Sequence, residues 1–174
     1  MEVKYIGKNK YPIIIIRGAT VNYDIPFVLY GIHPHPPVFP SYAKARNDLL
    51  VSSAKSLAGE EIDYKMLVGD FNTTNYSPWF SYVKEITDLN DSNEGLGLIS
   101  TWPSFVPNTF GLAIDNALIS DNIIVESKEL GPSMGSDHYP VVSSFKFKLP
   151  ENTNTRRSVT STDKVIDNTN EGDD

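Results

Sequence analysis

Short apolar runs separated by segments with helical periodicity are the feature that most constrains the fold of this chain. The runs are too short for typical helices and are rich in large or β-branched side chains, so they predict strands. The last run alternates apolar and polar residues, which is typical of a half-buried strand. The predicted strands lie at residues 13–17, 25–33, 65–68, 112–119, 123–125 and 139–149. Because helical segments lie between them, the predicted fold class is α/β or α+β.

Two helices are predicted between the strands. The first covers residues 41–58, with Ser41 as its predicted N-cap and Gly59 as its stop signal. Ser77 and Pro78 form an N-cap and first-turn pair that predicts the start of a second helix.

Residues 1–150 are expected to form one domain, and residues 151–174 a disordered acidic polar tail. The chain has 174 residues, of which 40% are hydrophobic, and this is enough for a single core. The tail consists mainly of Asn, Thr, Ser and Asp. Its few large apolar residues cannot offset the entropy lost on ordering.

The composition excludes several classes of protein. The absence of cysteine excludes disulfide scaffolds, cysteine-ligated zinc and cysteine nucleophiles. A net charge of -7 argues against non-specific binding of nucleic acid, and Lys44, Arg46 and Lys55 are interpreted as a solvated helix face. No apolar run reaches the roughly 20 residues of a transmembrane segment. No secretory signal is visible either, so a cytoplasmic location is expected.

Polar clusters stand at the ends of several predicted strands. His33 closes one strand, and the sequence Gly-Asp-Phe-Asn at 69–72 follows another. Ile-Asp-Asn occupies residues 114–116, and Gly-Ser-Asp-His-Tyr-Pro at 135–140 precedes the last strand. Three carboxylates and two histidines at strand ends predict a convergent active site.

In this order the motifs resemble the endonuclease/exonuclease/phosphatase superfamily, the DNase I-like metal-dependent phosphohydrolases. The resemblance covers about residues 11–149 and implies a four-layer α/β/β/α sandwich with the site at the sheet ends. It rests on His33, GDFN at 69–72, Ile-Asp at 114–115 and SDHYP at 136–140, together with HPHPP at 33–37 and TWP at 101–103.

The resemblance implies a role for each matching residue around a metal ion. Asp137 would bind Mg²⁺ or Mn²⁺, because these hard cations prefer carboxylate oxygen. His138 would contact the scissile phosphate or transfer a proton. Asp115 would accept the other ring N–H of that histidine and fix its tautomer.

The remaining motif residues would act on the nucleophile and the phosphate. Asp70 would orient or deprotonate the attacking water, and Asn72 would donate a hydrogen bond to the phosphate or the nucleophile. His33 would donate to a phosphate oxygen as negative charge grows there. The implied function is metal-dependent hydrolysis of a phosphate ester by a phosphodiesterase, nuclease or phosphatase. The substrate stays open between nucleic acid and a phospholipid headgroup.

The chain departs from the family pattern upstream of His33. The family carries an Asn and a metal-binding Glu on its first strands, and neither Glu2 nor Glu60 has a matching context. The chain therefore resembles the C-terminal portion of the domain, incomplete at the N-terminus. The alternative function is a catalytically silent fragment or binding module. A half-sandwich exposes a sheet edge and an apolar face that favour self-association, so the mass in solution would help to separate the two functions.

Three further patterns have simpler interpretations. Residues 131–135 match the G-x-S-x-G motif of serine hydrolases, but a strand follows them where that motif requires a helix. His33 and His35 form only a weak zinc pattern. Trp79 and Trp102 are interpreted as core or rim packing.

Overall fold

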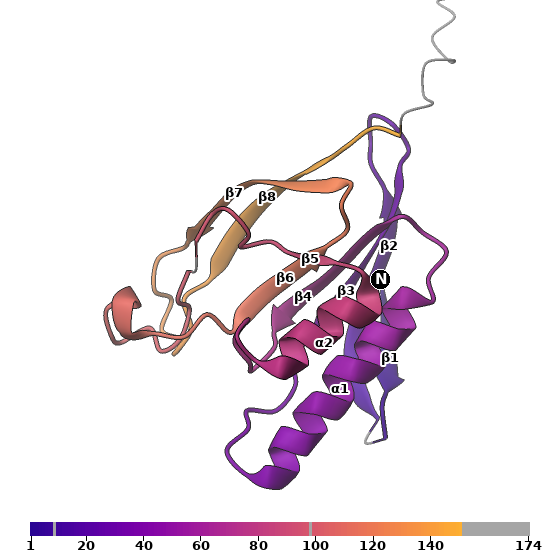
Figure 1. Cartoon of the computed structure of the whole chain (residues 1–174). Helices are drawn as coiled ribbons and strands as arrows, with labels where there is room; N and C mark the ends of the chain where they lie inside the picture. Colours follow the sequence, from indigo (N-terminus) through magenta and orange to yellow (C-terminus); the bar gives the residue numbers. More distant parts are fainter. Residues whose placement is uncertain (9, 98, 151–174) are drawn as a thin grey trace, which may run out of the picture.

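The computed structural model describes residues 1–8, 10–97 and 99–150, and the predicted tail at 151–174 lies outside this range. A six-stranded sheet has the order β1-β2-β3-β4-β6-β5, and β7 and β8 form a separate antiparallel pair (Figure 1). The strands are β1 (Glu2–Ile6), β2 (Tyr11–Ala19), β3 (Pro26–Ile32), β4 (Tyr64–Asp70), β5 (Asn90–Asp91), β6 (Asp115–Ile119), β7 (Ile123–Leu130) and β8 (Val141–Phe147). The helices are α1 (Pro40–Ala58), α2 (Pro78–Thr87) and a short 3₁₀ helix, η1 (Asn108–Phe110).

The direction of three central strands brings their polar ends to one edge of the sheet. Strands β3 and β4 are parallel because α1 carries the chain back between them. Strand β6 runs antiparallel to β4, so the first residue of β6 lies beside the last residue of β4. The ends of β3 and β4 and the start of β6 therefore meet at the same edge.

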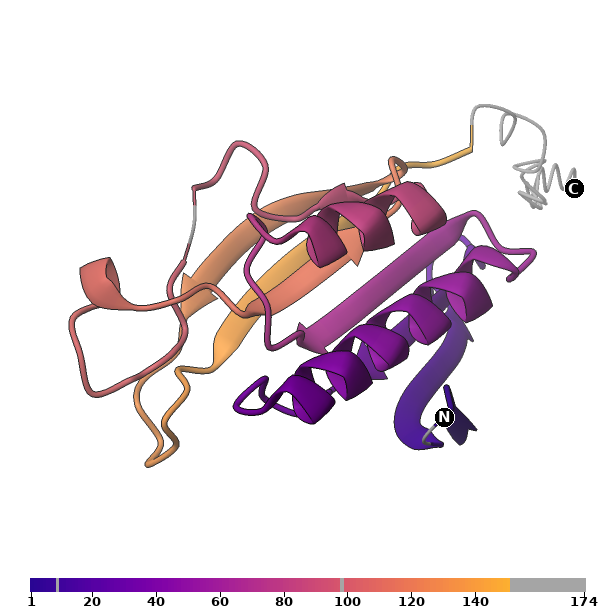
Figure 2. The ribbon, with the colours of Figure 1, turned by 60° about the horizontal axis from the view of Figure 1, so that its bottom comes forward.

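Both helices cover one face of the six-stranded sheet (Figures 1 and 2). Alternate residues of the central strands point towards the helices and are fully or nearly fully buried. This main core contains Ile13 and Ile15 of β2, Val28, Tyr30 and Ile32 of β3, Leu67 of β4, Leu49, Leu50 and Leu57 of α1, and Phe80 and Val83 of α2. This core packs β3 and β4 against the two helices.

The opposite face of the sheet is covered only in part, by the pair β7–β8. Phe147 of β8 stacks on Tyr64 of β4 with ring centroids 5.4 Å apart, and it meets Phe27 of β3 edge-on at 5.6 Å. Strands β1 and β2 lie beyond this cover. There Val3, Tyr5 and Ile14 point to the same face and are 54%, 65% and 45% exposed.

The structure corrects two details of the sequence prediction. Helix α1 has Phe39 as its N-cap, without a side-chain hydrogen bond, and Pro40 stands in its first turn. The prediction that Ser41 caps this helix is wrong, because proline fits the first turn and moves the start upstream. The predicted strand at 112–119 begins only at Asp115, since Leu112 forms an isolated bridge with Trp102 instead.

The structure confirms the predicted start of α2 and adds two strands that were not predicted. Ser77 caps α2 by accepting a hydrogen bond from the Trp79 backbone N–H at 3.2 Å, as predicted. Strands β1 and β5 were not predicted. Strand β1 has only five residues at a sheet edge, although it does alternate charged and apolar side chains, and β5 has only two residues. Among the described residues, no helix is long and apolar enough to cross a membrane.

Candidate active site

The site lies at the sheet edge where β3, β4 and β6 meet. Asp70 is the last residue of β4 and pairs in register with Asp115, the first residue of β6. His33 follows directly after β3, whose last residue, Ile32, pairs with Gly69 of β4. Three of the predicted site residues are thus brought together by strand register alone.

Gly69 allows the two parallel strands to approach closely enough for this arrangement. Its φ of +135° is a backbone conformation that residues with a Cβ rarely adopt. A Cβ at this position would lie 2.0 Å from the carbonyl oxygen of Ile32, which is far inside van der Waals contact. The glycine of the Gly-Asp-Phe-Asn motif therefore sets the spacing between His33 and Asp70.

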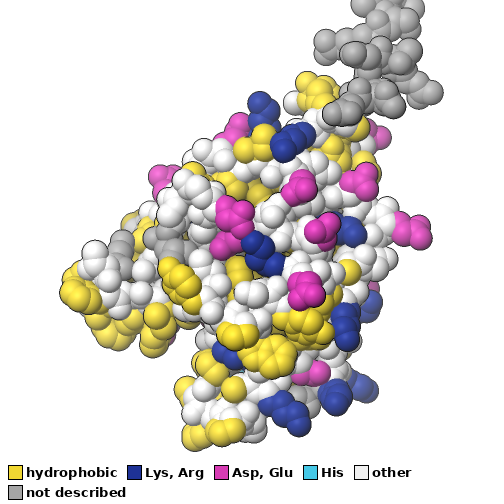
Figure 3. Space-filling model, in the orientation of Figure 1, with side chains coloured by type: hydrophobic (Ala, Val, Ile, Leu, Met, Phe, Trp, Pro, Cys, Tyr) yellow, Lys and Arg dark blue, Asp and Glu magenta, His cyan; other side chains and the backbone are white. Residues whose placement is uncertain are grey.

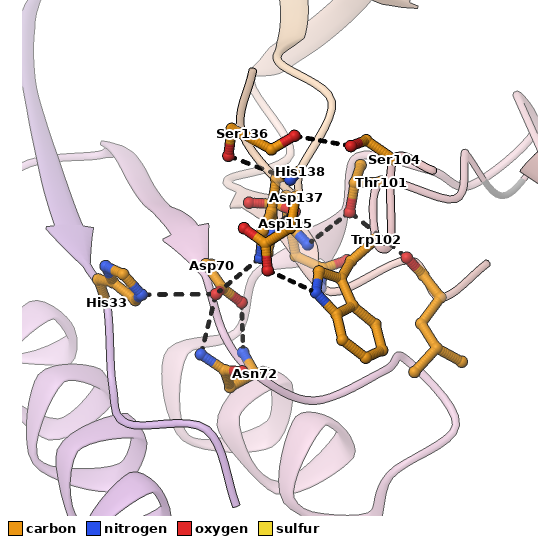
Figure 4. A network of polar contacts seen from close by, with 12 residues as sticks. His33, Asp70, Asn72, Thr101, Trp102, Ser104, Asp115, Ser136, Asp137 and His138 are labelled. Carbon is orange, nitrogen blue, oxygen red and sulfur yellow. Dashed lines mark hydrogen bonds and ion pairs between the residues drawn. The ribbon is translucent and has the colours of Figure 1, made fainter. Parts of the chain in front are cut away.

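Asp70 is the centre of the polar network shown in Figure 4. Its Oδ2 lies 3.6 Å from Nε2 of His33 and 3.9 Å from Nε2 of His138. Burial raises the pKa of Asp70, and the charge of Asp115 adds to this rise. The backbone N–H of Asn72 and the two histidines act in the opposite direction, but the pKa remains above its ordinary value.

Asn72 holds the Asp70 carboxylate in place. The backbone N–H of Asn72 donates to Oδ1 of Asp70 at 2.7 Å, and its side-chain Nδ2 donates to Oδ2 at 2.9 Å. The same Nδ2 donates to the Pro34 carbonyl at 3.0 Å. These contacts show that Asn72 positions Asp70, and its donation to a phosphate or nucleophile stays a prediction.

Arg46 of α1 contacts the loop that contains Asn72. Its guanidinium donates to the Asn72 carbonyl oxygen at 2.9 Å, and burial lowers the pKa of Arg46. The prediction that Arg46 belongs to a solvated face is therefore wrong, although its neighbour Lys44 is exposed as predicted. Sequence spacing could not separate them, because the contact joins α1 to a loop 26 residues further along the chain.

His138 and Asp115 form the closest acid–histidine pair of the site. Nδ1 of His138 lies 2.9 Å from Oδ2 of Asp115, which directs Nε2 towards Asp70 and the cavity (Figure 4). Burial by itself lowers the pKa of His138. The hydrogen bond and charge of Asp115, with the charges of Asp70 and Asp137, raise this pKa above its ordinary value.

Asp137 is held by a segment whose tryptophan, Trp102, was interpreted as core or rim packing. Nε1 of Trp102 donates to Oδ2 of Asp137 at 3.0 Å. Ser104 donates its backbone N–H to the Asp137 carbonyl oxygen at 2.8 Å and its hydroxyl to the Ser136 carbonyl at 2.6 Å. The motif Thr-Trp-Pro at 101–103 was the available signal for these residues.

All six predicted site residues line one cavity of about 930 Å³. Its walls are apolar on two sides, from Pro36, Pro37 and Val38 on one and from Trp102 and Leu112 on the other. Figure 3 shows hydrophobic side chains on the two projections at the left and the bottom of the molecule. The floor carries the carboxylates and histidines, and no Lys or Arg is found among the described residues that line the cavity.

The carboxylates suit a hard cation chemically but do not form a complete metal site. No group of three or more His, Cys, Asp or Glu side chains within residues 1–8, 10–97 and 99–150 is close enough to hold a metal ion. One oxygen of Asp137, the predicted ligand, is already occupied by Trp102. The predicted metal centre is therefore not complete in this part of the chain.

His35 and Ser133 belong to the two weaker sequence patterns. His35 stacks on Tyr42 with ring centroids 5.3 Å apart and meets Tyr11 edge-on at the same distance, which places it in an aromatic cluster. Ser133 makes no hydrogen bond to His138 within the described structure, and Nδ1 of His138 is engaged by Asp115. The contacts support neither a zinc site nor a serine nucleophile.

Comparison with solved structures shows the same fold. An endonuclease/exonuclease/phosphatase from Bacteroides vulgatus has a TM-score of 0.63 at 15% identity, with 84% of this chain and 64% of that chain covered. The catalytic domain of human Nocturnin with bound sulfate gives 0.62 at 17% identity, with coverage of 84% and 57%. A 3′ phosphatase from Neisseria bound to a product DNA hairpin gives 0.59 at 17% identity, with coverage of 84% and 71%.

The chain spans less than two thirds of the B. vulgatus and human structures that it matches. No curated protein matches the sequence. The sequence does match one family, over residues 1–138, which contain all six site residues. The chain belongs to the Endonuclease/Exonuclease/phosphatase family, whose members are metal-dependent phosphoesterases.

Proposed function

We propose that this protein hydrolyses a phosphate ester through attack by an activated water molecule. The observation that carries the proposal is the convergence of two carboxylates and two histidines in one cavity: Asp70, Asp115, His33 and His138. Asp70 lies 3.6 Å from His33 and 3.9 Å from His138, and His138 lies 2.9 Å from Asp115. Family membership supports the same reaction class. The organic part of the substrate stays open, although the apolar walls favour an ester with an apolar or aromatic group.

Asp70 is the proposed general base. Its raised pKa makes the carboxylate a stronger base than an exposed aspartate. Asn72 binds both carboxylate oxygens from one side, so the lone pairs that remain face the cavity and a water held there. This geometry orients the base before the substrate arrives.

His138 and His33 are the proposed donors to the phosphate. Asp115 accepts the Nδ1–H of His138 and keeps Nε2 turned towards the cavity. The raised pKa of His138 favours its protonated form, which stabilises negative charge on a phosphate oxygen or a leaving group. His33 presents Nε2 on the other side of Asp70.

A divalent cation, Mg²⁺ or Mn²⁺, is part of the proposal because three carboxylates line a cavity that would receive a phosphate. Asp137 is its proposed ligand in this chain, through the oxygen that Trp102 leaves free. Bound there, such a cation would neutralise phosphate charge. The described residues do not complete its coordination, so the other ligands would come from water, substrate or another polypeptide segment.

The test is hydrolysis of a chromogenic phosphodiester and a phosphomonoester by the purified chain with Mg²⁺, with Mn²⁺ and with chelator. Asp115→Asn should reduce turnover about 100-fold or more, because the neutral amide no longer stabilises a protonated His138 and can present an N–H donor to Nδ1, which favours the wrong tautomer. Asp63→Asn is the matched control, since Asp63 is exposed and lies outside the cavity. Turnover that persists in Asp115→Asn would contradict the site assignment.

A second candidate function, a binding module that associates with further β-structure, is favoured by the uncovered face of the sheet. On β1 the apolar residues Val3 and Tyr5 point to that face, while Glu2 and Lys4 point the other way. Among the described strands, β8 pairs only with β7, which leaves its other edge without a strand partner. In the purified chain the proposed occupant of this face is a second copy.

Sedimentation velocity over a range of concentrations tests this self-association. Ile14→Lys should shift the chain towards the monomer, because Ile14 lies within the uncovered face. Val142→Lys is the matched control, since Val142 is similarly exposed, at 52% against 45%, but lies on the outer side of β8. A wild-type chain that stays monomeric at high concentration would contradict the proposal.

A further inference from the structure

The segment from Thr101 to Ser104 links two parts of the active site that belong to different sheets. Asp115 starts a strand of the six-stranded sheet, whereas Asp137 and His138 precede β8 of the two-stranded sheet. Thr101 accepts the backbone N–H of Tyr139 at 2.8 Å on its carbonyl oxygen, and its hydroxyl lies 3.4 Å from the backbone N–H of Asp115. The segment therefore fixes the distance between the two parts.

Trp102 is the member of this segment whose side chain contacts the side chain of a site residue (Figure 4). Its backbone is anchored on both sides by Leu112, with Trp102 N–H donating at 3.1 Å and Leu112 N–H donating back at 2.6 Å. The indole Nε1–H then donates to Oδ2 of Asp137 at 3.0 Å. An anchored backbone with a rigid ring leaves this donor little freedom to move.

The direction of this hydrogen bond selects one orientation of the Asp137 carboxylate. An indole has one N–H donor and no acceptor, so it engages one carboxylate oxygen and leaves the other. Within the described residues, the structure shows no hydrogen bond to Oδ1 of Asp137. The side chain lines the cavity, so the unengaged oxygen is the one available to a ligand there.

We propose that Trp102 is a positioning residue that orients Asp137 for the chemistry of the site. Without the indole donor, the Asp137 side chain, on an exposed loop, would sample other staggered rotamers. The proposal rests on the proposed phosphoesterase function, because it assigns Trp102 a role in that reaction. The competing hypothesis is that the ring serves only as an apolar wall of the cavity.

The hydrogen bond itself is tested by NMR without any turnover. The chain has only two tryptophans, so its ¹H–¹⁵N spectrum holds two indole resonances, which Trp79→Phe assigns. The Trp102 indole proton should exchange with solvent at least 10-fold more slowly than that of Trp79, and Asp137→Ala should move only the Trp102 resonance and remove its protection. If Asp137→Ala changed neither the chemical shift nor the exchange rate of the Trp102 indole proton, the proposal would be overturned.

The functional consequence is tested with Trp102→Phe, which keeps an aromatic wall and removes the donor. We expect kcat for a phosphodiester to fall about 10- to 100-fold with a smaller change in KM, as for other residues that orient a catalytic ligand. Trp79→Phe should stay within about twofold of the wild type. Equal turnover in both variants would overturn the positioning role. A wild-type chain without any turnover would refute the proposed function instead, and the NMR result would still decide whether Trp102 orients Asp137.

Discussion

Replacing Gly69 by alanine should destabilise this protein far more than the same change at another glycine of positive φ. Gly95 is the matched control, because its φ is +81° and a Cβ there would meet nothing within 4 Å. At Gly69 a Cβ would lie 2.0 Å from the Ile32 carbonyl oxygen and 3.2 Å from the Ile32 nitrogen. Both variants carry backbone strain, but only Gly69→Ala forces two strands apart.

The size of the effect follows from these contacts. Strain at a positive φ costs about 1 to 3 kcal/mol, and we assign about 1 kcal/mol of it to Gly95→Ala. To relieve the overlap at Gly69, β3 and β4 must separate by more than about 1 Å, which breaks about two backbone hydrogen bonds worth roughly 1 kcal/mol each. The total for Gly69→Ala is then about 3 to 5 kcal/mol. The expected difference in free energy of unfolding is about 2 to 4 kcal/mol.

Urea denaturation, monitored by circular dichroism, measures this difference in free energy of unfolding. In thermal unfolding, Gly69→Ala should melt about 4 to 16 °C below Gly95→Ala. A second readout is turnover of a phosphodiester at a temperature where both variants are folded. The Gly69 variant should lose activity, because the spacing between His33 and Asp70 depends on the strand separation. Unfolding of both variants within about 1 °C of each other would refute the reasoning.

Two further predictions concern the surroundings of the site and the far end of the sheet. Arg46→Met should lower the stability by about 1 to 2 kcal/mol by leaving the Asn72 carbonyl without its donor, whereas Lys44→Met should be neutral in the same denaturation assay. An equal effect of the two changes would contradict the Arg46 contact. Glu60 accepts hydrogen bonds from Arg17 and from Tyr30, each at 2.6 Å. Burial by itself raises the pKa of Glu60, but these hydrogen bonds lower that pKa below its ordinary value. The stability from Glu60 is therefore present above about pH 4.3, the ordinary pKa of glutamate, and is lost as the pH falls towards the folded pKa. Glu60→Gln should be less stable than the wild type by about 1 kcal/mol at pH 7. This difference in free energy of unfolding should disappear at acidic pH.

The local pattern of the chain was sufficient to predict most of the elements. The β-branched runs formed β2, β3 and β4, and the Ser-Pro pair at 77–78 opened α2, because these signals depend on residues adjacent in sequence. The exact start of α1 was missed because a proline one residue earlier competes with Ser41. Strand β5, with two residues, depends on pairing with β6 and carries little signal of its own, whereas β1 carries a short alternating pattern that the prediction missed.

The chain by itself determined which residue types stand at the strand ends, and so predicted the composition of the site. Its order of motifs also indicated the family, and the match over residues 1–138 confirmed this. The resemblance also implied that Asp115 pairs with His138, and the two side chains lie 2.9 Å apart. Only the tertiary structure decided that Asn72 and Arg46 support Asp70 and that Trp102 lies against Asp137. The physical reason is that hydrophobic periodicity reports which face of each element is buried, whereas a hydrogen bond between residues 23 to 35 positions apart depends on strand register and loop path. Those quantities are set by packing of the whole domain.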